Sequence, residues 1–258
     1  MKIVLYTVLT GSYENLNQPK VVDSDFSYIC FSDELKKQRD GVWELRKIPN
    51  VTTDTKILSR YPKMHPHILL EDFDYSVYID ANIELLDDTL YKSVKNIVSK
   101  NICLAGMKHQ EVGCAYVEGL RIYTIGKERN IKTIIRTLRF LKREKFPYNY
   151  GMYEANVIFR NHHDPKVIKQ CELWWDCYMK YVKRDQITYP YTLWKNKIPF
   201  NYILPENYSA NNHPGFHVVQ EGHGRPKTKL RTFFKSILYP PTLWCMKRYV
   251  ELTKNIDT

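Results

Sequence analysis

Glycine is scarce in this chain and proline is not enriched, with 10 Gly and 13 Pro among its 258 residues. Collagen-like and low-complexity classes are therefore excluded. No stretch approaches the roughly 18 unbroken apolar residues that a membrane-spanning helix needs. The apolar start at residues 3–9 is short and no small-residue cleavage site follows it, so it predicts a buried first strand and not a signal peptide. We expect a cytoplasmic protein, or one attached peripherally to the inner face of the cell membrane.

Motifs of several other protein classes are also missing. The six cysteines form no C-x-x-C pair and have no zinc-ligand spacing, so we expect reduced, apolar cysteines and no structural metal clip. The sequence contains no G-x-S-x-G, no Walker loop and no G-x-G-x-x-G. Hydrolase, P-loop and dinucleotide sites built on those motifs are therefore not indicated.

Positive charge, by contrast, is concentrated in two segments. Residues 127–145 hold eight Lys or Arg against two Glu, and residues 223–258 hold eight against two acidic residues, a net charge of +6 in each. The rest of the chain holds 23 of the 39 basic and 24 of the 28 acidic residues. Two basic patches indicate docking to something anionic, whereas a uniform basic coat would indicate general nucleic-acid affinity.

Strand-like and helix-like patterns alternate along the chain. Short apolar or β-branched runs predict strands at residues 3–10, 26–31, 43–48, 75–79, 102–107 and 157–159. Helical spacing predicts helices at 54–71, 127–145 and 165–182, the first of them broken or kinked by Pro62 and Pro66. This order predicts an α/β fold with a mixed, mostly parallel sheet flanked by helices. We expect one domain over residues 1–222 and a basic, aromatic, helical extension over 223–258.

A carboxylate follows the predicted strand at residues 75–79. Asp80 comes directly after that strand, and Asn82 follows two positions later. Ligands bind at the carboxyl ends of strands in open α/β sheets, and an Asp-x-Asn pair suits Mg²⁺ or Mn²⁺ that also holds two phosphates. Asp and Asn are equally common in an ordinary strand-end turn, so the motif alone leaves both interpretations open.

Cationic or titratable side chains precede this motif in the sequence. They are Arg60, Lys63, His65 and His67. Such groups could neutralise a pyrophosphate leaving group, or they could form a solvated helix face.

A carboxylate and an amide, Asp185 and Gln186, follow a segment that contains Trp174 and Trp175. Sugar hydroxyls need such acceptors and donors, and a pyranose ring packs on an aromatic face. The alternative is a charged turn at a helix terminus. A late histidine-rich stretch, which includes His213, His217 and His223, could add a metal ligand and a phosphate contact, or could be simple loop composition.

Taken in order, these pieces resemble a known family. The motifs are Tyr6-Thr7-x-x-Thr10-Gly11-x-Tyr13-Glu14, Tyr28-Ile29-Cys30-Phe31-Ser32-Asp33, Arg60-x-x-Lys63-x-x-Pro66-His67, Tyr78-Ile79-Asp80-Ala81-Asn82-Ile83, Glu154-Ala155-Asn156, Trp174-Trp175 and Arg184-Asp185-Gln186. Seven ordered motifs over roughly residues 3–205 are hard to obtain by chance. On these residues the chain resembles the TOD/MUCI-type glycosyltransferase-like domain family, found in plant cell-wall proteins and in bacterial polysaccharide clusters.

That family is similar to GT-A enzymes, which transfer sugars from nucleotide donors on a Rossmann-like sheet, so the resemblance implies a GT-A-like fold. The donor-binding residues that it implies are Thr10, Gly11, Tyr13, Arg60, Lys63, His67, Asp80, Asn82 and Asn156. It also implies Mn²⁺ or Mg²⁺ held by Asp80, Asn82 and a late histidine, which we assign as His217. Asp185 and Gln186 would act at the anomeric carbon or at the acceptor hydroxyl.

We therefore expect transfer of a hexose from a nucleotide sugar, a UDP-sugar, to a glycan acceptor that is a lipid-linked polysaccharide intermediate. Residues 228–250 combine basic residues with Leu, Phe and Trp, so they could bind an anionic membrane surface or pack back on the domain. The alternative is a non-catalytic carbohydrate- or nucleic-acid-binding protein that uses the basic segments. Because the aromatic residues are not interleaved with basic ones in an RNA-binding module, we expect no specific nucleic-acid partner.

Overall fold

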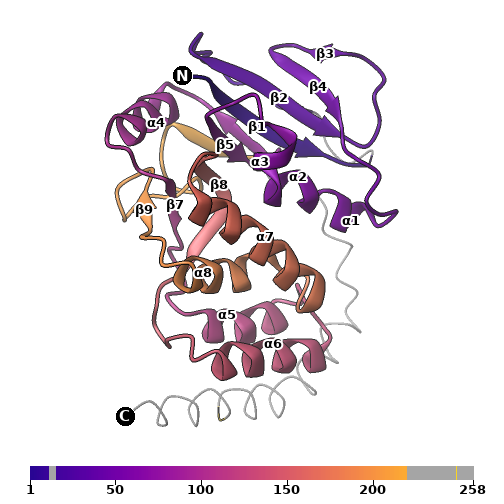
Figure 1. Cartoon of the computed structure of the whole chain (residues 1–258), viewed down its shortest axis with the longest axis vertical. Coiled ribbons are helices and arrows are strands. Elements are labelled where there is room, and N and C mark those ends of the chain that lie inside the picture. Colours follow the sequence, from indigo (N-terminus) through magenta and orange to yellow (C-terminus); the bar gives the residue numbers. More distant parts are fainter. Residues whose placement is uncertain (12–15, 220–247, 249–258) are drawn as a thin grey trace.

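The computed structural model describes residues 1–11, 16–219 and 248 (Figure 1). Tyr13 lies outside the described residues, as does the predicted extension over 223–258 apart from Arg248. The membrane-binding segment predicted at 228–250 therefore has no structural description here beyond that one residue. None of the helices in the described part of the chain is long and apolar enough to cross a bilayer.

A mixed sheet of eight strands, in the order β3-β4-β2-β1-β5-β8-β7-β9, forms the centre of the fold. Its parallel half consists of β1 (Ile3–Leu9), β2 (Phe26–Ser32), β4 (Trp43–Lys47) and β5 (Tyr75–Ile79). Six of the seven residues of β1 are buried, as expected for an inner parallel strand covered on both faces. The predicted α/β fold with a mixed, mostly parallel sheet is confirmed.

The other half of the sheet contains a long strand of opposite direction. β8 (Tyr153–Asn161) runs antiparallel to both of its neighbours, β5 and β7 (Leu104–Lys108). The last residue of β5, Ile79, therefore pairs with Val157 in the middle of β8, and just beyond it the backbone N–H of Asp80 donates to the carbonyl of Asn156 at 2.8 Å. This reversal brings two distant segments to one edge of the sheet.

Short strands complete the sheet system. β9 (Asn201–Tyr202) pairs parallel with β7, and β3 (Arg39–Asp40) pairs antiparallel with β4. A separate two-stranded ladder joins β6 (Ile83–Leu85) to β10 (Phe216–Val218).

Helices cover both faces of the sheet (Figure 1). Alternate side chains of β1 enter different hydrophobic clusters: Ile3 and Leu5 pack with α4 (Thr89–Ser99), while Val4 and Tyr6 pack with α7 (Pro165–Lys180) and α8 (Asp185–Lys195). A third cluster is formed where α5 (Ala115–Thr124) and α6 (Ile131–Arg143) meet α7 and α8.

The segment that contains Pro62 and Pro66 is broken, as predicted. It forms three short helices, α1 (Thr55–Leu58), α2 (Arg60–Met64) and α3 (Pro66–Leu69), and Pro66 occupies the first turn of the last one. A proline is accepted at that position because its missing N–H would have no partner there. The break orients the side chains of α2 toward the sheet edge described above.

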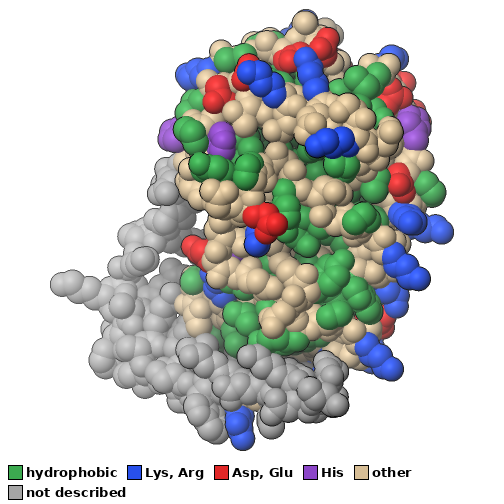
Figure 2. Space-filling model, turned by 90° about the vertical axis from the view of Figure 1, so that its left-hand side faces the viewer, with side chains coloured by type: hydrophobic (Ala, Val, Ile, Leu, Met, Phe, Trp, Pro, Cys, Tyr) green, Lys and Arg blue, Asp and Glu red, His purple; other side chains and the backbone are tan. Residues whose placement is uncertain are grey.

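The predicted basic helix at 127–145 is α6, which is shorter because the Asn130 side chain caps its start by accepting from the backbone N–H of Thr133. Its apolar side chains Ile134, Leu138 and Leu141 are buried, which leaves the basic residues on the other faces. On the face of the molecule seen in Figure 2, charged side chains are scattered over the described surface and form no continuous basic coat.

Candidate active site

A polar cavity of about 470 Å³ lies where β5 ends and β8 begins. Its walls come from α2, α5, α8, the two strands and the loop before β10. The cationic side chains that line it are Arg60, Lys63, Arg121, Lys127 and Arg184, and the carboxylates are Asp80, Glu111, Glu154 and Asp185. A volume of this size is ordinary for a small-molecule site, which falls at about 300–1,000 Å³.

Asp185 is the most strongly held carboxylate in the cavity. Its residue is 6% exposed, and its Oδ2 accepts from Lys63 Nζ at 2.7 Å and lies 3.2 Å from Arg60 Nε. Burial would raise the pKa of this carboxyl, but the charges of Lys63, Arg60 and Arg184 outweigh it and hold the pKa well below its usual range. Asp185 is therefore a fixed negative charge at neutral pH.

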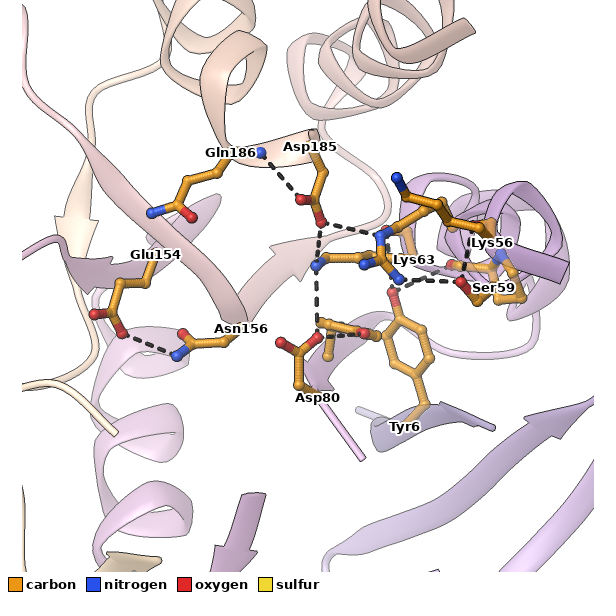
Figure 3. A network of polar contacts seen from close by, with 12 residues as sticks. Tyr6, Lys56, Ser59, Lys63, Asp80, Glu154, Asn156, Asp185 and Gln186 are labelled. Atoms are coloured by element: carbon orange, nitrogen blue, oxygen red, sulfur yellow. Dashed lines mark hydrogen bonds and ion pairs between the residues drawn. The ribbon is translucent and has the colours of Figure 1, made fainter. Parts of the chain in front are cut away.

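Lys63 connects this carboxylate to the predicted strand-end motif (Figure 3). Its side chain is 2% exposed, and its Nζ lies 2.7 Å from Asp185 and 3.6 Å from Asp80 Oδ1. The same ammonium group lies 4.8 Å from the centre of the Tyr78 ring. A buried lysine is retained in its charged form only when such partners replace its lost hydration.

Asp80 stands at the rim between the protein interior and the cavity. Its side chain is 37% exposed, and its Oδ1 accepts the hydroxyl proton of Tyr78 at 2.6 Å. Burial, and then the charge of Asp80, raise the pKa of Tyr78 well above its usual value, so the hydroxyl remains a donor. Asp80 thus presents a carboxylate whose orientation is set by a buried tyrosine.

Glu154 and Asn156 line the cavity across from Lys63 and Asp185 (Figure 3). They are two residues apart on β8, so their side chains share one face, and Asn156 Nδ2 donates to Glu154 Oε2 at 2.9 Å. Burial raises the pKa of Glu154, with further contributions from Asp80 and Glu111, against the hydrogen bond from Asn156. Asn156 Oδ1 is buried and has no hydrogen-bond partner among the described residues, so it is available to a ligand.

Gln186 follows Asp185 in the first turn of α8. Its backbone N–H donates to Asp185 Oδ1 at 3.1 Å, and its side chain extends toward the wall that carries Glu154 (Figure 3). The predicted pair Asp185 and Gln186 therefore lies at a helix start and in the cavity at once, so the two interpretations of this motif are compatible.

Six of the predicted donor-binding and catalytic positions thus meet in one cavity, while others lie elsewhere. The six are Arg60, Lys63, Asp80, Asn156, Asp185 and Gln186. Thr10 Oγ1 donates to the carbonyl of Thr55 at 3.4 Å, and the N–H of Gly11 donates to Asp33 Oδ2 at 2.8 Å, in the loop after β1. Neither lines the cavity. His67 pairs with Glu172 on α7, its Nε2 lying 2.7 Å from Oε1, and it does not line the cavity either.

The three predicted metal ligands are not brought together by the described side chains. Asn82 Nδ2 donates to the carbonyl of Val219 at 3.5 Å, and His217 Nδ1 lies 3.4 Å from Glu84 Oε2 across the β6–β10 ladder. Within residues 1–11, 16–219 and 248, no three His, Cys, Asp or Glu side chains are grouped as metal ligands. Of the predicted set, only Asp80 lines the cavity.

Several cavity residues have no role in the motifs taken from the sequence. They include Arg121 on α5 and Lys127 after it. Glu154 belongs to the Glu154-Ala155-Asn156 motif, but the motif alone indicates no role for it. Nothing in the local sequence could have identified Arg121 and Lys127, because only tertiary contacts bring α5 beside α8.

A second cavity of about 520 Å³ lies on the other side of α6, and none of the predicted site residues line it. Its lining residues are Lys132, Ile135, Arg136, Arg139, Phe140, Arg143, Lys180 and Tyr181.

The sequence of the chain is similar to those of known proteins. Residues 2–210 match the family described as TOD1/MUCI70, glycosyltransferase-like domain. Over 212 residues the chain is 24% identical to the probable hexosyltransferase MUCI70 of Arabidopsis thaliana, which covers 72% of this chain and 36% of that protein. The chain thus spans about a third of the length of this curated relative.

Among solved structures, the chain is similar to core-mannan synthase A (CmsA/Ktr4) from Aspergillus fumigatus in its Mn/GDP form. The TM-score is 0.46 at 7% sequence identity, and the match covers 78% of this chain and 72% of the other.

Proposed function

The chain belongs to the TOD1/MUCI70 glycosyltransferase-like domain family, and on that premise we propose that it transfers a hexose from a nucleotide sugar, a UDP-sugar, to a glycan acceptor. The acceptor in this proposal is a lipid-linked polysaccharide intermediate. The observation that carries the proposal is the ion-paired group of Asp185, Lys63 and Arg60 beside Asp80, all lining one cavity.

Sugar transfer from a nucleotide sugar requires stabilisation of a diphosphate that gains negative charge as it leaves. Lys63 and Arg60 supply preorganised positive charge for that step, because Asp185 already holds both of them in place. Groups that bind the transition state more tightly than the ground state accelerate the reaction.

The anomeric carbon becomes electron-poor as the diphosphate leaves. Asp185 is a permanent negative charge and a weak base, so its role in the proposal is to stabilise that carbon electrostatically. Gln186, which follows it in α8, orients a sugar or acceptor hydroxyl in the same cavity.

Glu154 is the better candidate to remove the proton of the acceptor hydroxyl. Burial raises its pKa from the ordinary value, which makes the ionised form a stronger base than an exposed glutamate. Its neighbour Asn156 donates to one carboxylate oxygen and so restricts the orientation of the group.

The remaining donor contacts in the proposal come from segments next to the cavity. Thr10, Gly11 and Tyr13 would contact the nucleotide from the loop after β1. His67 would reach the donor only by leaving its partner Glu172.

A divalent cation, Mn²⁺ or Mg²⁺, remains part of the proposal, with Asp80 as its cavity-facing ligand. Such ions take one or two protein carboxylates and fill other positions with phosphate oxygens, so Asp80 alone meets the minimum. Asn82 and His217 would have to turn from Val219 and Glu84 to contribute. When bound, the cation would add positive charge at the diphosphate.

The test is a panel of UDP-hexoses and GDP-hexoses incubated with the full chain, with and without Mn²⁺, with thermal shift and nucleotide release as readouts. We expect one UDP-hexose to raise the melting temperature and to release UDP. Retention on heparin and on RNA across a salt series measures the alternative, a non-catalytic binding protein. Strong retention without stabilisation or turnover by any nucleotide sugar would replace the proposed activity with that alternative.

Association with a membrane through residues 228–250 is a separate part of the proposal. It is tested by sedimentation with anionic and neutral vesicles at low salt. We expect the protein to sediment with the anionic vesicles and not with the neutral ones. Failure to sediment with the anionic vesicles, or equal sedimentation with both kinds, would contradict this part of the proposal.

A further inference from the structure

A second group of cations lines the cavity, apart from Arg60 and Lys63. Arg121 lies on α5, Lys127 in the connection between α5 and α6, and Arg184 directly before α8. Three separate segments of the chain therefore direct basic residues to one part of the cavity wall.

Two of these three cations have no ion-pair partner among the described residues. Arg121 pairs with Glu111 and lies 3.5 Å from Glu118 Oε2. Lys127 and Arg184 form no ion pair with the described residues, and Arg184 Nε is buried without a hydrogen-bond partner among them. A buried guanidinium N–H without an acceptor is costly, because it has lost water and gained nothing in return.

The cations also destabilise one another. The pKa of Lys127 is lowered, first by burial and then by the neighbouring charges of Arg184 and Arg121. The pKa of Lys56 is lowered by burial and then by Arg184. An anion bound beside Arg121, Lys127 and Arg184 would oppose the effect of the neighbouring positive charges on the pKa of Lys127.

The cations around Asp185, unlike Lys127 and Arg184, are ion-paired. There, Arg60 and Lys63 face the two carboxylates of Asp185 and Asp80, so the charges match in number. On the α5 side, Arg121 pairs with Glu111 and lies near Glu118, whereas Lys127 and Arg184 form no ion pair with the described residues. Among the described residues, the lining cations of the cavity that lack an ion pair are therefore on the α5 side.

We propose that Arg121, Lys127 and Arg184 form an oxyanion-binding subsite that holds a phosphate or carboxylate group of the glycan acceptor. This inference rests on the proposed function, in which the donor diphosphate occupies the Asp80 side of the cavity. An acceptor that enters from the α5 side brings its anionic group to Arg184, whose planar guanidinium suits two parallel hydrogen bonds to one oxyanion. The cavity of about 470 Å³ leaves room for both partners.

Inorganic phosphate is the probe, titrated calorimetrically into the full-length protein at low ionic strength. The variants are Lys127→Ala and Arg184→Gln, with Lys127→Arg as the charge-preserving form. Lys132→Ala is the matched control, since Lys132 is a basic residue nearby on α6 that lines only the second cavity. We expect each charge-removing variant to bind phosphate roughly tenfold more weakly, and the other two to bind like the wild type.

Saturating UDP and added acetate distinguish the possible sources of the oxyanion. The acceptor assignment predicts that phosphate affinity is unchanged when UDP is bound. Competition between UDP and phosphate would overturn it and assign the subsite to the donor's diphosphate. Competition by acetate would extend the subsite to carboxylates.

The subsite itself is overturned if the wild type binds neither phosphate nor acetate, or if Lys132→Ala loses as much affinity as Lys127→Ala. These results are independent of the proposed activity: a protein that ignores every nucleotide sugar but binds phosphate through Lys127 and Arg184 would keep the subsite and lose the glycosyltransferase assignment.

Discussion

The ammonium group of Lys63 lies 2.7 Å from the carboxylate of Asp185, although 122 residues separate them in the chain. Both residues are buried, and Lys63 lies at the same time 3.6 Å from Asp80. One cation therefore connects the end of β5 to the start of α8. The shape of the cavity and the stability of the fold depend on the same ion pair.

Removing one member of this pair should destabilise the protein strongly. We expect Lys63→Met to lower the free energy of unfolding by about 3–5 kcal/mol, because Asp185 would keep a buried charge with only Arg60 close by. Urea unfolding followed by circular dichroism measures this. The double variant Lys63→Met/Asp185→Asn should recover part of the loss, since the uncompensated carboxylate is then absent.

Lys92→Met is the matched control for that measurement. Lys92 also pairs with an aspartate, Asp88, at 2.8 Å, but the lysine is 75% exposed. An exposed pair contributes little, so unfolding should be almost unchanged. Equal losses for Lys63→Met and Lys92→Met would contradict the importance given to burial.

Asp80 should be essential for turnover but not for folding. We expect Asp80→Asn and Asp80→Ala each to reduce UDP-hexose turnover by roughly 100-fold or more, the scale found when a preorganised electrostatic group is removed. Only the alanine form leaves the Tyr78 hydroxyl without its acceptor, which should cost about 1–3 kcal/mol of stability. Near-normal turnover of the stable asparagine form would show that the cavity's chemistry does not depend on this carboxylate.

The affinity for UDP measured with Mn²⁺ and with a chelator gives a second readout for Asp80. We expect Mn²⁺ to tighten UDP binding in the wild type and to have less effect in Asp80→Asn. An affinity that is the same in chelator would assign the diphosphate to Arg60 and Lys63 without a metal.

Glu154 should set the acidic limb of the pH–rate profile. Its pKa is raised by burial, so the rate, which needs the carboxylate, should fall as the pH drops through a value above the ordinary glutamate pKa of about 4.3. Glu154→Gln should remove that limb and lower turnover. A profile with an unaltered limb in Glu154→Gln would exclude it as the base.

The same pKa shift has a signed effect on stability. A carboxyl whose folded-state pKa is raised contributes stability below its unfolded pKa, and that contribution is lost as the pH rises through the folded value. Glu154→Gln should therefore be at least as stable as the wild type at neutral pH. Thermal unfolding at two pH values checks the direction.

Asp185→Asn and Gln186→Ala should lower turnover more than they weaken UDP binding. In the proposal both act at the reacting carbon or the acceptor hydroxyl, and an interaction made mainly in the transition state changes kcat without changing nucleotide affinity. Turnover and UDP titration on the same samples separate the two. An equal loss of affinity would move both residues into the donor pocket.

The inner strands and the anchor residues of the site were predictable from local patterns. β1, β2 and β5 are continuous apolar runs because they are buried on both faces, and Asp80 ends such a run. The break before Pro66 follows from proline geometry alone, whereas Pro62 is accommodated in the first turn of α2.

Other parts depend on contacts between distant segments and could not be predicted in this way. The strand predicted at 157–159 extends over Tyr153–Asn161 because β5 pairs with residues 157–161 and β7 pairs with residues 153–154 and 158–160. α8 contains Pro190 together with β-branched and aromatic residues, which local propensity disfavours in a helix, and its position is set by packing against α7 and β8. Nor does any spacing rule indicate that His217 pairs with Glu84 across a ladder.

The position of β8 between β5 and β7 also determines when these two earlier strands can be paired during synthesis. Until residues 153–161 leave the ribosome, both of those earlier strands have an unpaired edge, and such edges can associate with other chains. Lys63 can contact Asp80 before its second partner, Asp185, has been translated, so the ion-paired group of the cavity is completed later still. A nascent chain halted before residue 161 would thus be prone to aggregation, and one halted just before α8 could pair β1, β2, β4, β5, β7 and β8 but would lack β9 and the Asp185 wall of the cavity.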